Sequence, residues 1–250
     1  MKKQGISQET LKLIASGTML IDHIGATLVL SAFYAVIAAE DYAAADSWVS
    51  LYNIMRLIGR IAFPIYCFLL VEGFRHTRDL KKYTGRLAIG VLLAEIPFDL
   101  ALNGALFDWS SNSVMLTLLL GVLMMAGMDC FNGWWKLLAV PPFYGIAELL
   151  QTDYAGHGIL IIAMLALTRG IPYEKLWRTA GFAVLLWFGA TISFGPIEVP
   201  MEIFGLMALV PIFLYDGRKL TRSKAVQWGF YLFYPVHLLV IWAVHTLIFG

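Results

Sequence analysis

The chain has 250 residues, of which 60% are hydrophobic and 14% charged, and its mean hydropathy is +0.74. This composition excludes an ordinary soluble domain and indicates a membrane protein. The formal net charge of +1 gives no basis for nucleic-acid binding, and two cysteines are too few for a disulfide framework.

Nine apolar segments follow one another along the chain, with turn residues between them. A helix needs roughly 20 residues to cross a bilayer, and these segments have between 13 and 28 residues. No stretch remains for a soluble domain, so we expect an all-α polytopic membrane bundle that forms one domain over residues 1–250. The expected spans are 11–38, 53–74, 85–103, 113–130, 134–151, 157–169, 175–193, 200–215 and 226–248.

The lysines and arginines predict the orientation of these spans. With a cytoplasmic N-terminus, 16 of the 18 fall in inside segments, as the positive-inside rule requires. The outside segments, such as "EDYAAADSW", contain none. We therefore expect nine spans in a multi-pass protein of the bacterial cytoplasmic (inner) membrane. The inside cations are Lys2, Lys3, Lys12, Arg75, Arg78, Lys81, Lys82, Arg86, Lys136, Arg169, Lys175, Arg178, Arg218, Lys219, Arg222 and Lys224.

Asp22 and His23 interrupt the first apolar span. Because a helix rises about 1.5 Å per residue, His23 lies about 18 Å into a hydrocarbon layer roughly 30 Å thick. The same counting places Arg60 and His237 at about 18 Å from the inner boundary. Ionisable groups at such depth are expensive and usually functional, so we expect these groups to form an intramembrane site.

Other polar residues extend this layer. Glu95 and Asp99 lie at depths of about 14 and 20 Å. A polar trail continues toward the outer face with Glu148, Asp153, His157, Glu198 and Glu202. Residues four apart share one helix face. The pairs with this spacing are Arg56 with Arg60, Glu95 with Asp99, and Glu198 with Glu202.

An imidazole beside a carboxylate is typical of a general base, and a nearby arginine can bind an anion or stabilise an oxyanion. Asp22 and His23 are about 100° apart on their helix, so Asp22 could instead face an arginine while His23 faces a substrate. Phosphate-loop, zinc-protease and serine-elbow motifs are missing, and we expect no metal. A membrane transferase fits these residues. A proton-coupled transporter using the same groups, a non-enzymatic assembly factor and a purely structural role are the alternatives.

Six stretches in order carry a family resemblance: "LKLIASGTMLIDHIGA", "RLIGRIAFPIYCFLLVEGFRHTRDLKKYTGRL", "LLAEIPFDLAL", "TLLLG", "DYAGHGIL" and "YLFYPVHLL". They resemble the TraX family, whose best-known members acetylate the N-terminus of F-type conjugative pilin, and the resemblance extends over nearly the whole chain. The resemblance implies an acetyltransferase with acetyl-CoA as donor. The implied acceptor is exported: the N-terminal amine of a pilin-like polypeptide, or a hydroxyl of an envelope glycan.

Within this hypothesis the candidate residues have three roles. The catalytic candidates are His23, Asp22 and His237, and which histidine is the base stays open. The substrate-binding candidates are Arg60, Arg56, Glu95, Asp99 and Tyr234. The candidates for binding acetyl-CoA are Arg75, His76, Arg78, Lys81 and Lys82, which could otherwise serve orientation and phospholipid contact.

Overall fold

The computed structural model describes residues 5–194, 197–221 and 223–250. It is 77% helical, so the prediction of an all-α fold is confirmed. Three of the predicted inside cations, Lys2, Lys3 and Arg222, lie outside the described residues.

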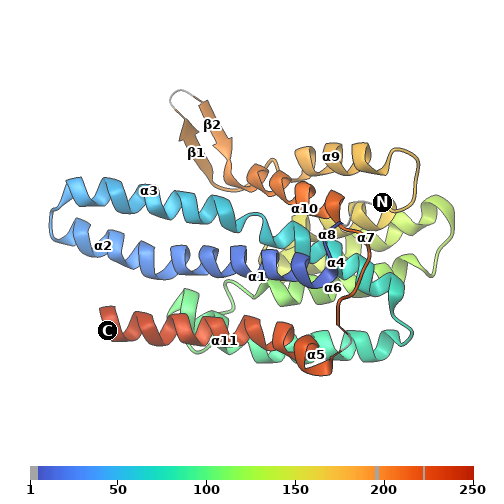
Figure 1. Ribbon diagram of the computed structural model, residues 1–250, viewed down its shortest axis with the longest axis horizontal. Helices are drawn as coiled ribbons and strands as arrows, with labels where there is room; N and C mark the ends of the chain where they lie inside the picture. Colours follow the sequence, from blue (N-terminus) through green and yellow to red (C-terminus); the bar gives the residue numbers. More distant parts are fainter. Residues whose placement is uncertain (1–4, 195–196, 222) are drawn as a thin grey trace.

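Long helices at the start of the chain form an extended hairpin that continues into the bundle (Figure 1). Ser7 caps the first helix by accepting a hydrogen bond from the Thr10 amide at 3.1 Å, and Asp41 caps the return helix through the Ala44 amide at 3.0 Å. The elements are α1 (Gln8–Ile24), the π-helix η1 (Gly25–Val29), α2 (Leu30–Ala38), α3 (Tyr42–Gly59) and α4 (Ala62–His76).

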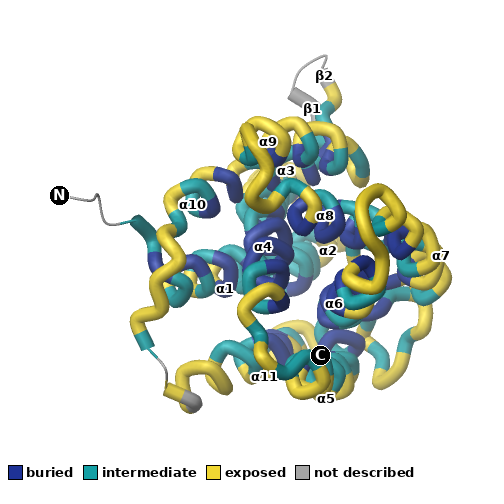
Figure 2. Tube along the Cα trace, turned by 90° about the vertical axis from the view of Figure 1, so that its right-hand side faces the viewer, coloured by how far each residue is buried: buried dark blue, intermediate teal, exposed yellow. Residues whose placement is uncertain are grey.

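The helix α4 lies at the centre of the bundle, where Figure 2 shows it surrounded by α1, α6 and α8. Its buried residues run almost without interruption from Ala62 to Val71. This continuous apolar surface fits a helix that has protein on all sides.

The remaining elements complete the bundle and add one short hairpin. They are α5 (Leu80–Phe98), the π-helix η2 (Asp99–Asn103), α6 (Val114–Met128), the 3₁₀-helix η3 (Gly133–Ala139), α7 (Val140–Leu149), α8 (Ala155–Leu167), α9 (Glu174–Leu185), β1 (Thr191–Phe194), β2 (Ile197–Pro200), the 3₁₀-helix η4 (Met201–Ala208), α10 (Leu209–Leu214) and α11 (Lys224–Phe249). β1 and β2 pair antiparallel, with Thr191 opposite Pro200.

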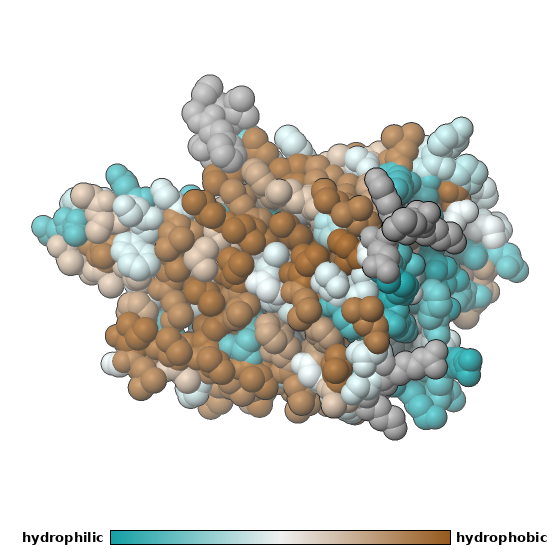
Figure 3. All heavy atoms as spheres, in the orientation of Figure 1, coloured by the Kyte–Doolittle hydropathy of each residue, from teal (hydrophilic) through white to brown (hydrophobic). Residues whose placement is uncertain are grey.

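Within the described part of the chain, three helical segments are long and apolar enough to cross a membrane by length and composition. They are Gln8–Ala38, Tyr42–His76 and Ala225–Phe249. Shorter apolar helices accompany them, and exposed hydrophobic side chains cover much of the face in Figure 3. The chain is therefore a membrane protein.

Hydrophilic residues gather at one end of the molecule, the right-hand end of Figure 3. Here α1 begins, α4 ends and α5 begins (Figure 1). Arg75 at the end of α4 pairs with Asp129 just after α6, at 3.6 Å. We call this the basic end, and the opposite end, where α2 turns into α3, the far end.

Two sequence expectations about these elements were wrong. The segment "EDYAAADSW" was expected as a loop, but α3 begins within it, at Tyr42. The expected helical span 175–193 ends early, at Leu185, and its last residues enter the β-hairpin. Consequently Glu198 lies in β2 while Glu202 lies in η4, and this pair does not share a helix face as predicted.

Candidate active site

Two histidines from opposite ends of the sequence meet in the bundle. His23 Nδ1 of α1 lies 2.7 Å from His237 Nε2 of α11. Their rings are stacked with centroids 5.0 Å apart, and both residues are buried. The structure thus joins two residues that depth counting placed at one level.

The hydrogen bonds of this pair assign the ring protons. His237 Nδ1 lies 2.7 Å from the carbonyl oxygen of Phe233, and a carbonyl can only accept, so Nδ1 carries the hydrogen. In the neutral ring, His237 Nε2 must then accept, and His23 Nδ1 donates to it. His23 Nε2 has no hydrogen-bond partner among the described residues, so its lone pair is free. Of the two histidines, His23 therefore has the nitrogen that can take a proton.

Asp22 faces away from this pair and joins two arginines. Its carboxylate accepts from Arg56 Nη1 and from Arg60 Nη2, both at 2.8 Å. Arg60 also donates from Nη1 to Glu202 Oε1 at 2.5 Å. Of the two predicted arrangements, the structure forms the one in which Asp22 faces arginine. The alternative, in which Asp22 orients His23, is wrong because His237 takes that position.

The backbone places Arg60 where it can reach both acids. Arg60 lies at the break between α3 and α4, and its Nε donates to the Arg56 carbonyl at 3.1 Å. Gly59 lets α3 approach α1, because a Cβ at this position would overlap the Asp22 side chain. Arg56 and Arg60, which were predicted to share one helix face, therefore both reach the carboxylate of Asp22.

A small cavity of about 150 Å³ opens beside these groups. It brings an imidazole with a free lone pair next to two arginines and two carboxylates. Its polar lining residues are Asp22, His23, Arg56, Arg60, Tyr66, Asp153 and Tyr154.

Asp153 and Glu202 belong to this site although their predicted place was only along the polar trail toward the outer face. Asp153 enters on the loop between α7 and α8, where its carbonyl accepts a hydrogen bond from Thr117. Its carboxylate has no hydrogen bond or ion pair with another described residue. Glu202 enters on η4, is 9% exposed, and its Oε2 has no hydrogen-bond partner within the described ranges.

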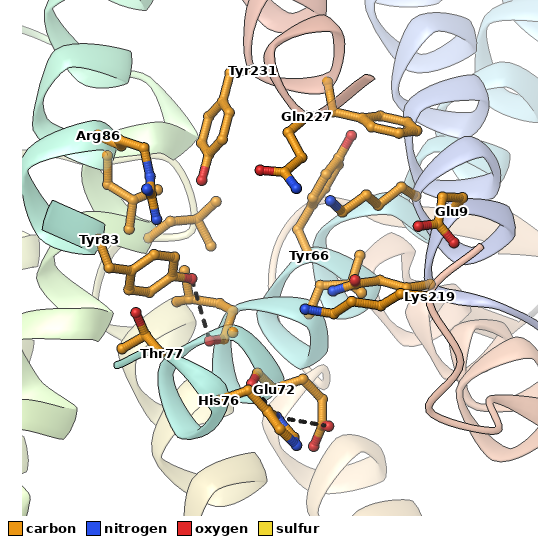
Figure 4. A pocket seen from close by; sticks show the side chains of 18 of the residues that line it. Glu9, Tyr66, Glu72, His76, Thr77, Tyr83, Arg86, Lys219, Gln227 and Tyr231 are labelled. Carbon is orange, nitrogen blue, oxygen red and sulfur yellow. Dashed lines mark hydrogen bonds and ion pairs between the residues drawn. The ribbon is translucent and has the colours of Figure 1, made fainter. Parts of the chain in front are cut away.

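A larger cavity of about 550 Å³ opens at the basic end (Figure 4). It reaches Tyr234, whose ring centroid is 5.7 Å from that of His237. Side chains from α4, α5 and α11 converge on it, among them Tyr66, Arg86, Gln227 and Tyr231. We call the part next to the small cavity its inner end. Both cavities share three lining residues there, Met19, Tyr66 and Val114.

The opening of the large cavity is rich in cations. Arg169 is paired with Glu72 at 2.7 Å, but Arg78, Arg86 and Lys219 form no ion pair with any described residue. The charged residues that line the cavity are Glu9, Lys12, Glu72, Arg78, Arg86, Arg169 and Lys219. Cations therefore exceed acids, and the opening suits a polyanionic ligand.

Only part of the predicted basic cluster lines this cavity. His76 and Arg78 do, whereas Arg75 pairs with Asp129, and Lys81 and Lys82 lie outside the lining. Lys82 instead pairs with Asp79 at 3.0 Å, and the Lys82 amide hydrogen bond lowers the pKa of the Asp79 carboxyl. Sequence reasoning missed Lys12, Arg86, Arg169 and Lys219 as cavity residues, although it counted all four as inside cations.

Glu95 and Asp99 line neither cavity. Glu95 accepts from the amide and hydroxyl of Ser113, at 3.1 and 2.8 Å. Asp99 accepts from Asn103 at 3.0 Å and from the Asp108 amide at 3.1 Å. Both carboxylates hold α5 and η2 to the segment before α6, and so shape the wall behind the site.

Comparisons with known proteins identify the family of the chain. The model of the family described as "TraX protein" matches residues 7–245. The chain is 30% identical over 249 residues to a probable fimbrial assembly protein FimC, serogroup H1, of Dichelobacter nodosus, and the match covers 92% of each chain. No solved structure matches the chain. The resemblance seen in the sequence is confirmed, and the chain belongs to the TraX family.

Proposed function

We propose that the protein is a membrane-embedded acetyltransferase that moves an acetyl group from acetyl-CoA to an exported acceptor. The observation that carries this proposal is the meeting of two cavities beside one free imidazole nitrogen. A large cavity with a cationic opening reaches the level of His23, and a small cavity contains His23 itself. A donor and an acceptor that enter from opposite sides would meet there.

The donor occupies the large cavity in this proposal. The phosphates of acetyl-CoA lie near Arg78, Arg86 and Lys219, whose charges are not neutralised by ion pairs with described residues. The pantetheine arm follows the apolar part of the cavity along Tyr66 and Leu118. This places the thioester at the inner end, beside the wall that the two cavities share.

The acceptor occupies the small cavity, where His23 Nε2 acts as general base. The acceptor nitrogen or oxygen forms a bond to the thioester carbonyl carbon while its proton passes to Nε2. The C–S bond then breaks, and the thiolate takes the proton from the imidazolium. His237 keeps His23 in the tautomer that this step needs.

The acceptor is the N-terminal amine of a pilin-like polypeptide or a hydroxyl of an envelope glycan. Support for a polypeptide comes from the relative described as a probable fimbrial assembly protein. The site itself supplies the ion network of Arg56, Arg60 and Asp22 for holding a charged group of the acceptor.

We further propose a multi-pass arrangement in the bacterial inner membrane, with about nine crossings and the N-terminus and basic end in the cytoplasm. The segment Gln8–Ala38 has 31 residues, which gives a helix of about 46 Å against a hydrocarbon layer of roughly 30 Å. The α2–α3 hairpin therefore extends beyond the membrane at the far end, where the acceptor arrives.

The test is acetyl transfer by purified protein in proteoliposomes, with radiolabelled acetyl-CoA and either a peptide amine or a glycan as acceptor. Wild-type protein should label one of them, and His23→Ala, in protein that still folds, should not. Solute-dependent proton flux without any transfer would instead favour a transporter. Full activity of His23→Ala would remove His23 from the mechanism.

A further inference from the structure

Tyr234 combines burial with a missing hydrogen bond. The residue is 5% exposed, and its phenol O–H has no acceptor within the described residues. Leaving a buried hydroxyl unsatisfied costs free energy. A phenylalanine would fill the same space without that cost, so packing alone does not account for the hydroxyl.

The position of Tyr234 relates it to the reaction. It lines the large cavity and lies one helical turn before His237 on α11. Its ring stands edge-on to both histidine rings, with its centroid 6.0 Å from that of His23 and 5.7 Å from that of His237. The unsatisfied hydroxyl is therefore placed where the inner end of the donor cavity approaches the base.

Other polar side chains of this region already have partners. The hydroxyl of Tyr66 is 2.9 Å from Ser16 Oγ, and His237 uses both of its ring nitrogens. Among these three neighbours Tyr234 is the one whose side chain donates to no described residue and shares no hydrogen bond. A ligand atom that accepts a hydrogen bond would satisfy it.

We propose that Tyr234 is a catalytic residue whose hydroxyl donates a hydrogen bond to the carbonyl oxygen of the acyl thioester. This inference rests on the proposed acetyltransferase function and adds the group that stabilises the oxyanion. When the acceptor atom bonds to the carbonyl carbon, negative charge moves onto the carbonyl oxygen, and the Tyr234 hydrogen bond strengthens. When the C–S bond breaks, the charge leaves with the sulfur, and Tyr234 keeps its proton throughout.

An infrared measurement tests this contact without turnover. Full-length His23→Ala protein, which cannot transfer, is mixed in detergent with acetyl-CoA labelled with ¹³C at the carbonyl carbon. A hydrogen bond to the carbonyl lowers its stretching frequency, so binding should shift the band down. In the double variant with Tyr234→Phe the bound band should lie at a higher frequency than in the His23→Ala protein, because the hydrogen bond to the carbonyl is missing. An equal downward shift in both proteins would overturn the role of Tyr234.

Kinetics give the second arm, in an otherwise wild-type protein. Tyr234→Phe should lower kcat by a factor on the order of 10²–10³ with little change in the dissociation constant for acetyl-CoA. Tyr34→Phe, which alters an exposed tyrosine of α2, should stay within about twofold of wild type. A Tyr234→Phe protein with wild-type kcat refutes the proposal while leaving the acetyltransferase function in place. Failure of wild-type protein to bind acetyl-CoA refutes both.

Discussion

Gly59 and Asp22 are in such close contact that no larger residue fits at position 59. A Cβ built on Gly59 would overlap Oδ1, Cβ and Cγ of Asp22. This approach brings α3 against α1 at the level of the site, and it lets Arg56 and Arg60 reach the same carboxylate.

Replacing Gly59 with alanine should therefore break the ion network, although alanine favours helix. We expect Gly59→Ala to lower thermal stability in detergent and to abolish transfer, because Asp22 must move away from the arginines. The matched control is Gly17→Ala in α1, where a Cβ meets nothing within 4 Å. That variant should be as stable as wild type or slightly more so. Equal behaviour of the two variants would show that the close contact does not matter.

Removing the Asp22 carboxylate should destabilise the fold strongly. Asp22→Ala leaves Arg60, which is 9% exposed, with one carboxylate partner instead of two, and breaking a buried ion pair typically costs about 3–5 kcal/mol. Denaturant unfolding in detergent measures this free energy. Asp46→Asn on the exposed side of α3 is the control and should change the stability by less than about 0.5 kcal/mol. A similarly small change for Asp22→Ala would contradict the assigned network.

The two histidines should behave as one unit in activity. His23→Ala removes the base, and we expect a loss of about 10²–10⁴-fold in kcat. His237→Ala should lose less, because the base remains and only its tautomer is no longer fixed. The double variant should match His23→Ala, since residues that act as a unit are not additive. If the losses of the single variants multiply in the double variant, the histidines act independently and the tautomer argument fails.

Donor binding should depend on cations that line the large cavity and not on their neighbours in sequence. Arg86→Ala and Lys219→Ala should each raise the KM for acetyl-CoA by about 1.5- to fivefold, and the effect should shrink at high salt. Lys82→Ala, whose side chain pairs with Asp79 outside the cavity, should leave KM unchanged. A larger increase in KM for Lys82→Ala than for Arg86→Ala and Lys219→Ala would indicate that acetyl-CoA binds at the basic cluster predicted from the sequence.

The proposed orientation can be tested with a native cysteine. Cys130 is exposed and Cys67 is buried, and Cys130 follows Asp129 at the basic end. A membrane-impermeant maleimide should label Cys130 in inverted vesicles but not in intact spheroplasts. Ser47→Cys in a Cys130→Ser background should give the reverse pattern, since Ser47 lies on the exposed side of α3 near the far end. Labelling of Cys130 in intact spheroplasts would show that the protein has the opposite orientation in the membrane.

Depth along a helix could be predicted from the sequence because the rise per residue is nearly constant. That is why His23 and His237 were placed at one level. Lateral neighbours could not be predicted in the same way, because they depend on which helices pack together. The sequence therefore left open whether Asp22 faces His23 or an arginine, and it placed Glu95 and Asp99 with the site when their carboxylates bind Ser113, Asn103 and the Asp108 amide instead.

The missed residues lie where the helical assumption fails. Asp153 enters the site on a loop, where counting helical rise has no meaning, and Glu202 lies beyond a β-strand. A signal for the helix at Tyr42 was present, since alanine is the best helix former and Asp41 is a good cap. The hydropathy pattern outweighed it, because charged residues within "EDYAAADSW" suggested a loop.

The π-helix η1 separates His23 of α1 from α2, which continues the same long helical segment toward the far end. Its wide turn is visible in the bond from the Leu30 amide to the Gly25 carbonyl, five residues apart. Deleting one residue in this turn would rotate α2 by about 100° relative to α1. His23 would keep His237, while the Ser31 contact to His245 at 2.8 Å would be lost. The segment Gln8–Ala38 is thus continuous in shape, but the rotation of α2 about its axis is set independently of α1. A single insertion or deletion in η1 can therefore change the surface beyond the membrane while His23 and His237 stay in place.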